Sequence, residues 1–467
     1  MNRLLPLLFL VGVLASPVMA DLGDGLPEAG AVDSTHAYAS SDMMVARLPQ
    51  MLWNALVYPV GRFTIYAELT ELPRRVEEVF TNDAGTFGIF PQVQLGGETN
   101  TGGGLSLFHS DLFGAGKELN AIYIYSAADR QRAELLYRDG NLRGGPWFLE
   151  LHGNYLDTDS EDATINGIVE GRRDLFPDEP SLFALQQLDV TGRLGWRSNT
   201  GQLEDYSPQL SMTLQGGWST RDLSTDIVGI PDLQGETSTS TASAIPGLGQ
   251  DLSYGWLGLR LAWDDRDAKP VTSHLSHPLI YQFPGRVLLE HEGLYHSYRD
   301  IAYPEGGGLA EVSVDLARGA DDVSFARLGA EVQRFHTLFW SNRVLAGRIR
   351  VDKVFPLDDG FAPYADLPTL GGGQRLKGYQ RGTYRGEGAL LMALEYRWPI
   401  WDTWSASLFW EEGQVFDEFG DIDPDLFGST IGAQMILRTE TAFLLGLRVA
   451  HSADETALLG FMLEQEF

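Results

Sequence analysis

Glu395 and Glu411 are the two residues whose type and placement come closest to a chemical function. A pair of carboxylates can act as general acid and general base when their surroundings separate their pKa values. Each glutamate, however, alternates with apolar neighbours such as Leu394 and Trp410, a pattern typical of a β-strand with one polar face. A barrel with a polar interior accounts for both side chains without catalysis, so we expect them to be acidic residues of a lumen.

Other catalytic and metal-binding patterns are missing from the sequence. There is no cysteine, no G-x-S-x-G elbow, no H-E-x-x-H helix motif and no P-loop, which removes the familiar nucleophile, zinc and phosphate signatures. Several of the nine histidines fall between 265 and 307, namely His274, His277, His291 and His296. Their spacing matches no ligand template, and a metal site there is the alternative to scattered polar residues. We predict a protein that is not an enzyme and holds no metal or other cofactor.

The strand that carries Glu395 follows a loop rich in glycine and basic residues. From 390 to 398 the even-numbered residues are apolar, whereas Glu395 and Arg397 fall on the opposite face, so one face suits lipid and the other a polar lumen. Glycine lets such a loop fold into a charged interior without steric cost; a solvated surface loop is the alternative. The loop contains Gly371, Gly372, Gly373, Gly378, Gly382, Gly386 and Gly388, with Arg375, Lys377, Arg381 and Arg385.

The same alternation recurs from residue 86 to the end of the chain. Segments of about ten residues separated by turn residues are typical of a transmembrane barrel. We predict an all-β fold, a transmembrane antiparallel β-barrel of 16 strands with a short N-terminal extension, and fourteen or eighteen strands are the alternatives. The segments are 86–95, 102–111, 118–127, 130–139, 145–155, 185–197, 207–219, 253–264, 308–317, 325–338, 342–354, 388–398, 404–414, 428–437, 442–450 and 457–467. Alternation also places four charges in the lumen: Arg260, Asp264, Arg266 and Arg397.

The N-terminal residues have the features of an export signal. Residues 1–20 combine a positive start at Arg3, an apolar run and small residues up to Ala20, which predicts a cleaved secretory signal peptide. A short buried helix is the alternative. Residues 21–85 show little strand pattern and are interpreted as a short periplasmic or lumenal extension, and the barrel occupies 86–467. No later stretch approaches the roughly 18 apolar residues of a membrane-spanning helix.

Connection lengths test this topology, because bacterial barrels have short periplasmic turns and longer outer loops. With both chain ends in the periplasm, the long connections 156–184, 220–252 and 355–387 fall on the outer side. The connection 265–307 is the exception, since it follows the eighth predicted strand. We expect it to be an inserted segment that faces the periplasm.

Three motifs follow one another in the C-terminal part of the chain. They are Gly371-Gly372 with Leu376-Lys377-Gly378-Tyr379, then Glu395-Tyr396-Arg397, then Phe409-Trp410-Glu411-Glu412-Gly413. The first resembles the sixth extracellular loop of the BamA/TamA superfamily, a bacterial surface antigen type of outer membrane barrel, which carries GG and then [VL]-R-G-[FY]. The second resembles the E-Y-R strand of that superfamily, and the third resembles its F-x-D-x-G strand. Lys377 stands in place of the usual arginine, and Glu411 in place of aspartate. Asp264 to Arg266 similarly resembles the family's D-x-R motif.

The resemblance implies roles for these residues. In the superfamily the loop-six arginine reaches strand acids from within the lumen, and here that role falls to Lys377 with Glu395 and Glu411 as partners. Ordinary lumen charges without a loop contact are the alternative. Phe467, an aromatic residue at the end of an alternating strand, resembles the signal by which such barrels are handed to their assembly machinery. The resemblance does not extend to residues 21–85, where we find no pattern of a periplasmic POTRA domain.

Charge and resemblance together limit the function classes. A net charge of −30 argues against nucleic acid as a partner, because nucleic acid requires basic patches. The resemblance implies localisation in the bacterial outer membrane, with outer-membrane lipid and lipopolysaccharide around the barrel, the assembly machinery as partner during insertion, and a periplasmic docking partner. It also implies transport, assembly or insertion of polypeptide or lipid. A structural or passive-pore barrel without cargo handling is the alternative.

Overall fold

The computed structural model describes residues 79–94, 102–126, 130–163, 181–198, 209–223, 246–247, 249–266, 304, 306–338, 343–372, 375–379, 382–399, 404–438, 444–452 and 458–462. Several predictions lie outside these residues and stay predictions. They concern the signal peptide 1–20, nearly all of the extension 21–85, the histidines of the 265–307 insert and the C-terminal Phe467.

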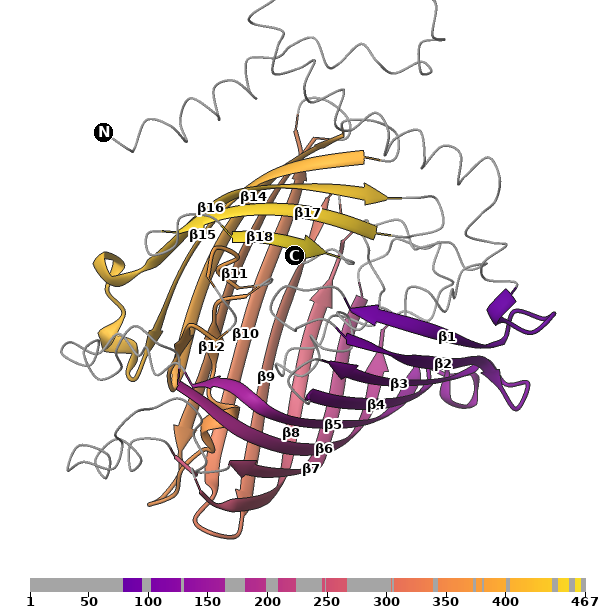
Figure 1. Ribbon diagram of the computed structural model, residues 1–467, viewed down its shortest axis with the longest axis horizontal. Helices are drawn as coiled ribbons and strands as arrows, with labels where there is room; N and C mark the ends of the chain where they lie inside the picture. Colours follow the sequence, from indigo (N-terminus) through magenta and orange to yellow (C-terminus); the bar gives the residue numbers. More distant parts are fainter. Residues whose placement is uncertain are drawn as a thin grey trace, which may run out of the picture.

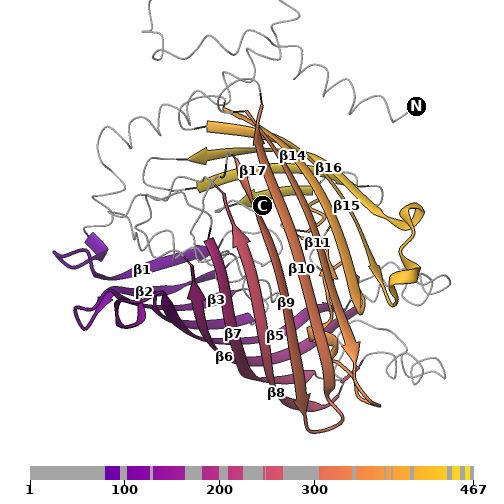
Figure 2. The same ribbon diagram turned by 180° about the vertical axis from the view of Figure 1, so that it is seen from behind.

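The described chain is almost entirely antiparallel sheet. One 16-stranded sheet runs in sequence order from β1 to β18, without the two short strands β12 and β13. Figures 1 and 2 show it curling into a barrel wall, so that β14–β18 lie across from β1–β5. Its strands are β1 (Phe87–Gln94), β2 (Gly102–Leu112), β3 (Lys117–Ser126), β4 (Arg130–Asp139), β5 (Trp147–Ala163), β6 (Ser181–Arg197), β7 (Gln209–Leu223), β8 (Asp251–Asp264), β9 (Gly307–Gly319), β10 (Ser324–Thr337), β11 (Val344–Pro356), β14 (Gly388–Pro399), β15 (Trp404–Phe416), β16 (Gly428–Arg438), β17 (Leu444–Ser452) and β18 (Leu458–Met462).

Each predicted segment corresponds to one strand of this sheet, so the predicted fold class is confirmed. The largest differences are at one end of β5, β6 and β7, where the strands run into regions predicted as loops. The β5–β6 ladder, for example, continues through Thr158 opposite Leu185 to Ala163 opposite Ser181. Those ends lack the apolar alternation that a lipid-facing band needs, but backbone hydrogen bonds sustain a ladder without it.

The two faces of the wall differ as the alternation predicts. On β14, Leu394 is 43% exposed on the outside, whereas Glu395 is 1% exposed. On β8, Leu259, Leu261 and Trp263 point outward and Arg260 and Asp264 are buried. The outer surface is therefore apolar and the lumen polar, which is the arrangement of a membrane barrel. No helix within the described ranges is long and apolar enough to cross a membrane.

The connections alternate between the two ends of the barrel because neighbouring strands are antiparallel. The ends of β8 and β9 that flank the insert lie at the same end of the barrel as the turn 113–116 and the adjacent ends of β10 and β11. The connection 357–387 between β11 and β14 starts at the opposite end, as does the tight hairpin 320–323. At the two edges of the sheet, the residues described for β1 and β18 form no ladder with each other.

Candidate functional site: loop six in the lumen

The connection 357–387, which we call loop six, folds back on itself. It contains a short 3-10 helix, η6 (Tyr364–Asp366), and two short strands, β12 (Thr369–Leu370) and β13 (Tyr384–Arg385). β12 and β13 pair in an antiparallel ladder that joins the outgoing and returning limbs. We call residues 361–367 the base of loop six and residues 375–379 its tip.

Two glycines shape the chain that leads into the tip. Gly371 and Gly372 have φ values of 102° and 106°, a region open to glycine but strained for other residues. The Gly371 amide donates to the Arg375 carbonyl at 2.7 Å, and the Gly372 amide donates to the Tyr379 carbonyl at 2.9 Å. These bonds close the tip into a compact turn. The glycine pair singled out in the sequence therefore has a backbone role.

Lys377 contacts Glu411 through both its side chain and its backbone. Its Nζ lies 2.9 Å from Glu411 Oε1, and its amide nitrogen donates to Glu411 Oε2 at 2.6 Å. The two side chains are 2% and 1% exposed. Nζ also lies 4.9 Å from the ring centroid of Phe409, a favourable position for a cation. We call this pair the tip contact; it compensates two charges that would be costly to bury alone.

Apolar packing surrounds the tip contact. Leu370, Leu376 and Tyr379 of loop six form one buried cluster with Ala389, Leu391 and Val415 of β14 and β15. Gly378 lies against β16 and β17: a Cβ atom there would come within 2.8 Å of Thr430 Cγ2 and 3.2 Å of the His451 carbonyl carbon. The tip therefore approaches the wall too closely for any side chain at position 378.

Glu395 is bound mainly by residues of the wall. Arg397 Nε lies 3.3 Å from Glu395 Oε1 and Arg397 Nη2 lies 3.3 Å from Oε2. Gln434 Nε2 donates to Oε1 at 2.8 Å. The structure thus places Glu411 in direct contact with Lys377 and surrounds Glu395 with Arg397 and Gln434.

The other predicted lumen charges form ion pairs along the wall. Arg260 forms an ion pair with Glu311 of β9. Arg266 turns back to Asp264 with Nε and Nη2 each 2.9 Å from a carboxylate oxygen, and its Nη1 donates to Gln333 at 3.4 Å. The alternation placed these residues inside the barrel, and the structure does not bring Arg260, Asp264 or Arg266 to the tip of loop six.

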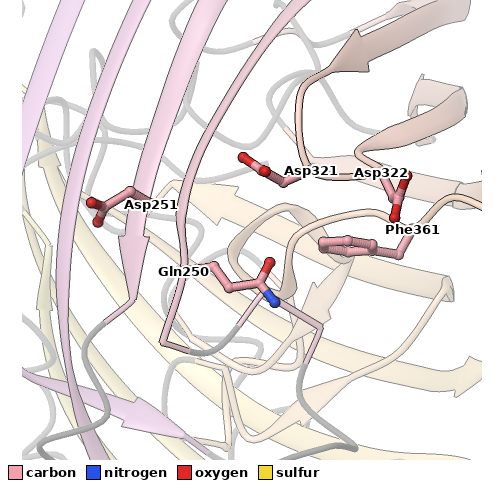
Figure 3. A pocket seen from close by; sticks show the side chains of 5 residues that line it. All are labelled: Gln250, Asp251, Asp321, Asp322 and Phe361. Atoms are coloured by element: carbon pink, nitrogen blue, oxygen red, sulfur yellow. The ribbon is translucent and has the colours of Figure 1, made fainter.

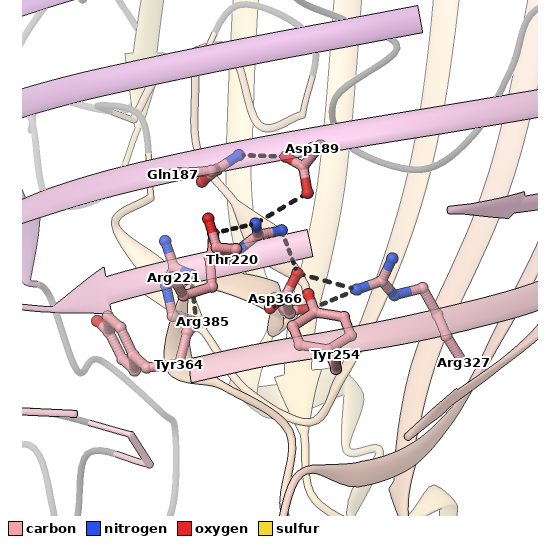
Figure 4. A network of polar contacts seen from close by, with 9 residues as sticks. All are labelled: Gln187, Asp189, Thr220, Arg221, Tyr254, Arg327, Tyr364, Asp366 and Arg385. Carbon is pink, nitrogen blue, oxygen red and sulfur yellow. Dashed lines mark hydrogen bonds and ion pairs between the residues drawn. The ribbon is translucent and has the colours of Figure 1, made fainter. Parts of the chain in front are cut away.

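Sequence reasoning missed a second polar cluster, at the base of loop six (Figure 4). Asp366 Oδ1 lies 2.9 Å from Arg221 Nη2 and 3.5 Å from Arg327 Nη2, and Tyr254 donates to Oδ2 at 2.7 Å. Arg221 also lies 2.8 Å from Asp189. We call these five residues the base cluster. They come from four strands and the loop, so no spacing in the sequence links them, and inward alternation was the only available signal.

A shallow pocket lies beside the base of loop six (Figure 3). Its volume is about 480 Å³, and Gln250, Asp251, Asp321, Asp322 and Phe361 line it. Three carboxylates line it, but within the described ranges no group of three or more His, Cys, Asp or Glu side chains is placed to hold a metal ion. We assign no ligand to this pocket.

A family model described as the Omp85 superfamily domain matches residues 111–449, more than half of the 467 residues. The chain belongs to the Omp85 superfamily. The predicted relation to BamA-type barrels is confirmed by this match. It includes loop six and the strands that hold its tip. A comparison with curated proteins gives no match.

A solved BamA structure shares the fold of this chain, and two CdiB structures are similar with lower TM-scores. The crystal structure of BamA from Haemophilus ducreyi lacking POTRA domains 1–3 is similar with a TM-score of 0.51 and 12% identity, over 81% of this chain and 70% of that chain. CdiB from Acinetobacter baumannii is similar with a TM-score of 0.44 and 10% identity, over 81% of this chain and 65% of that chain. CdiB from Escherichia coli is similar with a TM-score of 0.47 and 10% identity, over 80% of this chain and 61% of that chain. This chain therefore spans less than two thirds of either CdiB chain.

Proposed function

We propose that this Omp85 barrel handles cargo at the bacterial outer membrane, by transporting, assembling or inserting polypeptide or lipid. The observation that carries the proposal is a loop six folded inside the lumen, with Lys377 in the position of the family's motif and bound to Glu411 at 2.9 Å. We infer that a loop held in this way obstructs the lumen. An obstructed lumen suits a barrel that opens for cargo better than one that conducts steadily.

The wall offers two routes for cargo. One is the lumen, once loop six moves. The other lies between the two edge strands of the sheet, β1 and β18. Their described residues do not pair with each other; β1 pairs with β2, and β18 pairs with β17. An unpaired strand edge presents free backbone donors and acceptors, which can template another strand. The proposal assigns binding and movement to this protein and no covalent chemistry, so it is not an enzyme and needs no cofactor.

The proposed setting follows from the surface chemistry and the family. An apolar outer face suits outer-membrane lipid, and the acidic outer loops suit lipopolysaccharide bridged by divalent cations. The outer-membrane assembly machinery inserts this barrel into the membrane. A periplasmic protein docks at the end of the barrel opposite loop six. Residues 1–20 direct export as a signal peptide. No nucleic acid takes part.

The test is depletion of the protein in cells, followed by profiling of outer-membrane proteins and lipids. We expect a defined set of proteins or lipids to fall, and a plasmid carrying the wild type or Lys377→Arg to restore them. Lys377→Ala should not restore them. Arg334→Ala is the matched control, because Arg334 lies exposed on the outer face, and it should complement fully. Unchanged profiles together with lost solute permeability would instead support the passive-pore alternative.

A further inference from the structure

The base cluster fixes loop six to a part of the wall that lies far from its tip. Asp366 contacts β7, β8 and β10 through Arg221, Tyr254 and Arg327, whereas Lys377 contacts β15 through Glu411. In the order of the sheet, β11 and β14 lie between β15 and β10, the nearest of the three strands that contact Asp366. Loop six is therefore held at two separate places around the lumen.

Asp366 is the central acceptor of the base cluster. Its side chain is 6% exposed, and its two oxygens receive the Arg221, Arg327 and Tyr254 donors. Figure 4 shows these three side chains pointing toward Asp366 from different strands. Hydrogen bonds between charged groups are stronger than neutral ones. Loss of this one carboxylate therefore weakens the attachment of the loop to three strands at once.

Apolar contacts around Asp366 fix the rest of the base. Tyr364 packs with Leu156, Leu185 and Leu223 of β5–β7. Ala362 and Phe361 pack in the cluster that contains Leu252 and Phe325 of β8 and β10. The Tyr364 amide also donates to the Pro246 carbonyl at 2.9 Å, so the end of the β7–β8 loop contacts the base. Asp366 is thus a polar centre enclosed by packed side chains.

Contacts between the two limbs join the base to the segment that leads to the tip. Arg385 of β13 donates to the Tyr364 carbonyl at 2.7 Å, and its guanidinium lies 4.5 Å from the centroid of the Tyr364 ring. The Gly386 amide donates to the Pro368 carbonyl at 3.2 Å. Together with the β12–β13 ladder, these contacts join the two limbs between the base and the tip.

We propose that Asp366 is the positioning residue that holds loop six over the β6–β10 side of the lumen, and that this side opens when the Asp366 contacts break while the tip stays bound. The inference rests on the proposed function, because it concerns how the same loop closes the lumen. The inference adds a residue, Asp366, that the motif at Lys377 does not indicate.

Conductance of the purified full-length chain in planar lipid bilayers tests this inference. The wild type should stay mostly closed, and Asp366→Asn, which keeps the shape but removes the charge, should raise the open fraction about tenfold, equivalent to about 1.4 kcal/mol. Tyr254→Phe removes one hydrogen-bond donor to Asp366 and should also raise the open fraction, by a smaller factor. If Asp366→Asn does not assemble, Tyr254→Phe alone decides the test.

A cross-link supplies a readout that general destabilisation would not give. Val323 and Phe361 are partners in a parallel bridge between the β9–β10 hairpin and the base, and the chain has no natural cysteine. In the Asp366→Asn background, Val323→Cys with Phe361→Cys should close the barrel when oxidised and reopen it when reduced. The same cysteines with Asp366 intact should leave it closed in both states.

A buried carboxylate elsewhere in the wall is the matched control. Glu134 of β4 accepts from Arg132 Nε at 2.7 Å, and Glu134→Gln removes the same charge as Asp366→Asn. It should leave the open fraction at the wild-type value. The inference is overturned if Asp366→Asn behaves like the wild type, if Glu134→Gln opens the barrel equally, or if oxidation fails to close it. Steady conductance by the wild-type protein would also overturn the inference, and it would favour the passive-pore alternative. Cargo profiling decides the proposed function independently of these currents.

Discussion

The tip and the base of loop six are held by different kinds of contact. The tip depends on one ion pair, Lys377 with Glu411, enclosed by apolar side chains of β14 and β15. The base depends on one carboxylate, Asp366, shared among donors from three strands. A local motif marks the first in the sequence, whereas only inward alternation marks the strand residues of the second. A functional loop can therefore have one attachment that is readable from a motif and another that exists only in the fold.

Removal of the tip contact should have the largest effect. Lys377→Ala and Glu411→Ala each leave the partner charge buried without compensation, a loss of about 3–5 kcal/mol when fully buried and less in a wet lumen. We expect trypsin to cut after Arg375 in either variant and not in the wild type, measured on intact barrels in detergent or lipid. Cleavage of the wild type at this position would contradict a buried tip.

Removal of the Asp366 contacts at the base should have the second-largest effect, and it should affect a different region of loop six. Asp366→Asn keeps an oxygen acceptor but removes the charge that strengthens its hydrogen bonds, a loss of about 1.4 kcal/mol, which is equivalent to tenfold. Hydrogen exchange should quicken at amides of residues 361–367 and stay slow at 375–379. Equal acceleration at both would mean that base and tip unfold as one unit.

Glu395→Gln should have a smaller effect on loop six than Glu411→Ala. Glu395 is bound by Arg397 and Gln434, so loss of its charge disturbs the wall while Lys377 keeps Glu411. Trypsin resistance at Arg375 should persist, and thermal stability should fall. If Glu395→Gln exposes Arg375 as fully as Glu411→Ala, then the two acids share Lys377 equally, as the family resemblance implied.

Lys377→Arg should have the smallest effect of the set. Arginine keeps the positive charge and can bind a carboxylate with two parallel hydrogen bonds. We expect unchanged or stronger protection of the tip against trypsin, and full complementation in cells. A loss of protection would show that the space around Glu411 and Phe409 is fitted to lysine.

Much of the fold was predictable because alternation is imposed by the two environments of a barrel wall. The opposite exposures of Leu394 and Glu395 follow directly from their neighbours. The polar ends of β5–β7 were not predictable, since backbone pairing beyond the apolar band leaves no hydrophobic pattern. At the site, the motif identified Lys377 and Glu411. Arg221 and Tyr254 are brought together by the order of the strands, and the fold of loop six brings Asp366 to them.

A pair of double-mutant cycles tests most directly that loop six is held at independent places. The first combines Lys377→Ala with Glu411→Ala, and the second combines Lys377→Ala with Asp366→Asn, with the free energy of opening measured by hydrogen exchange across the loop. Residues in contact should couple and distant ones should add within about 0.3–0.5 kcal/mol. We predict that the first double variant is little worse than either single change and that the second is the sum of both. Additive effects in the first cycle, or strong coupling in the second, would contradict the account.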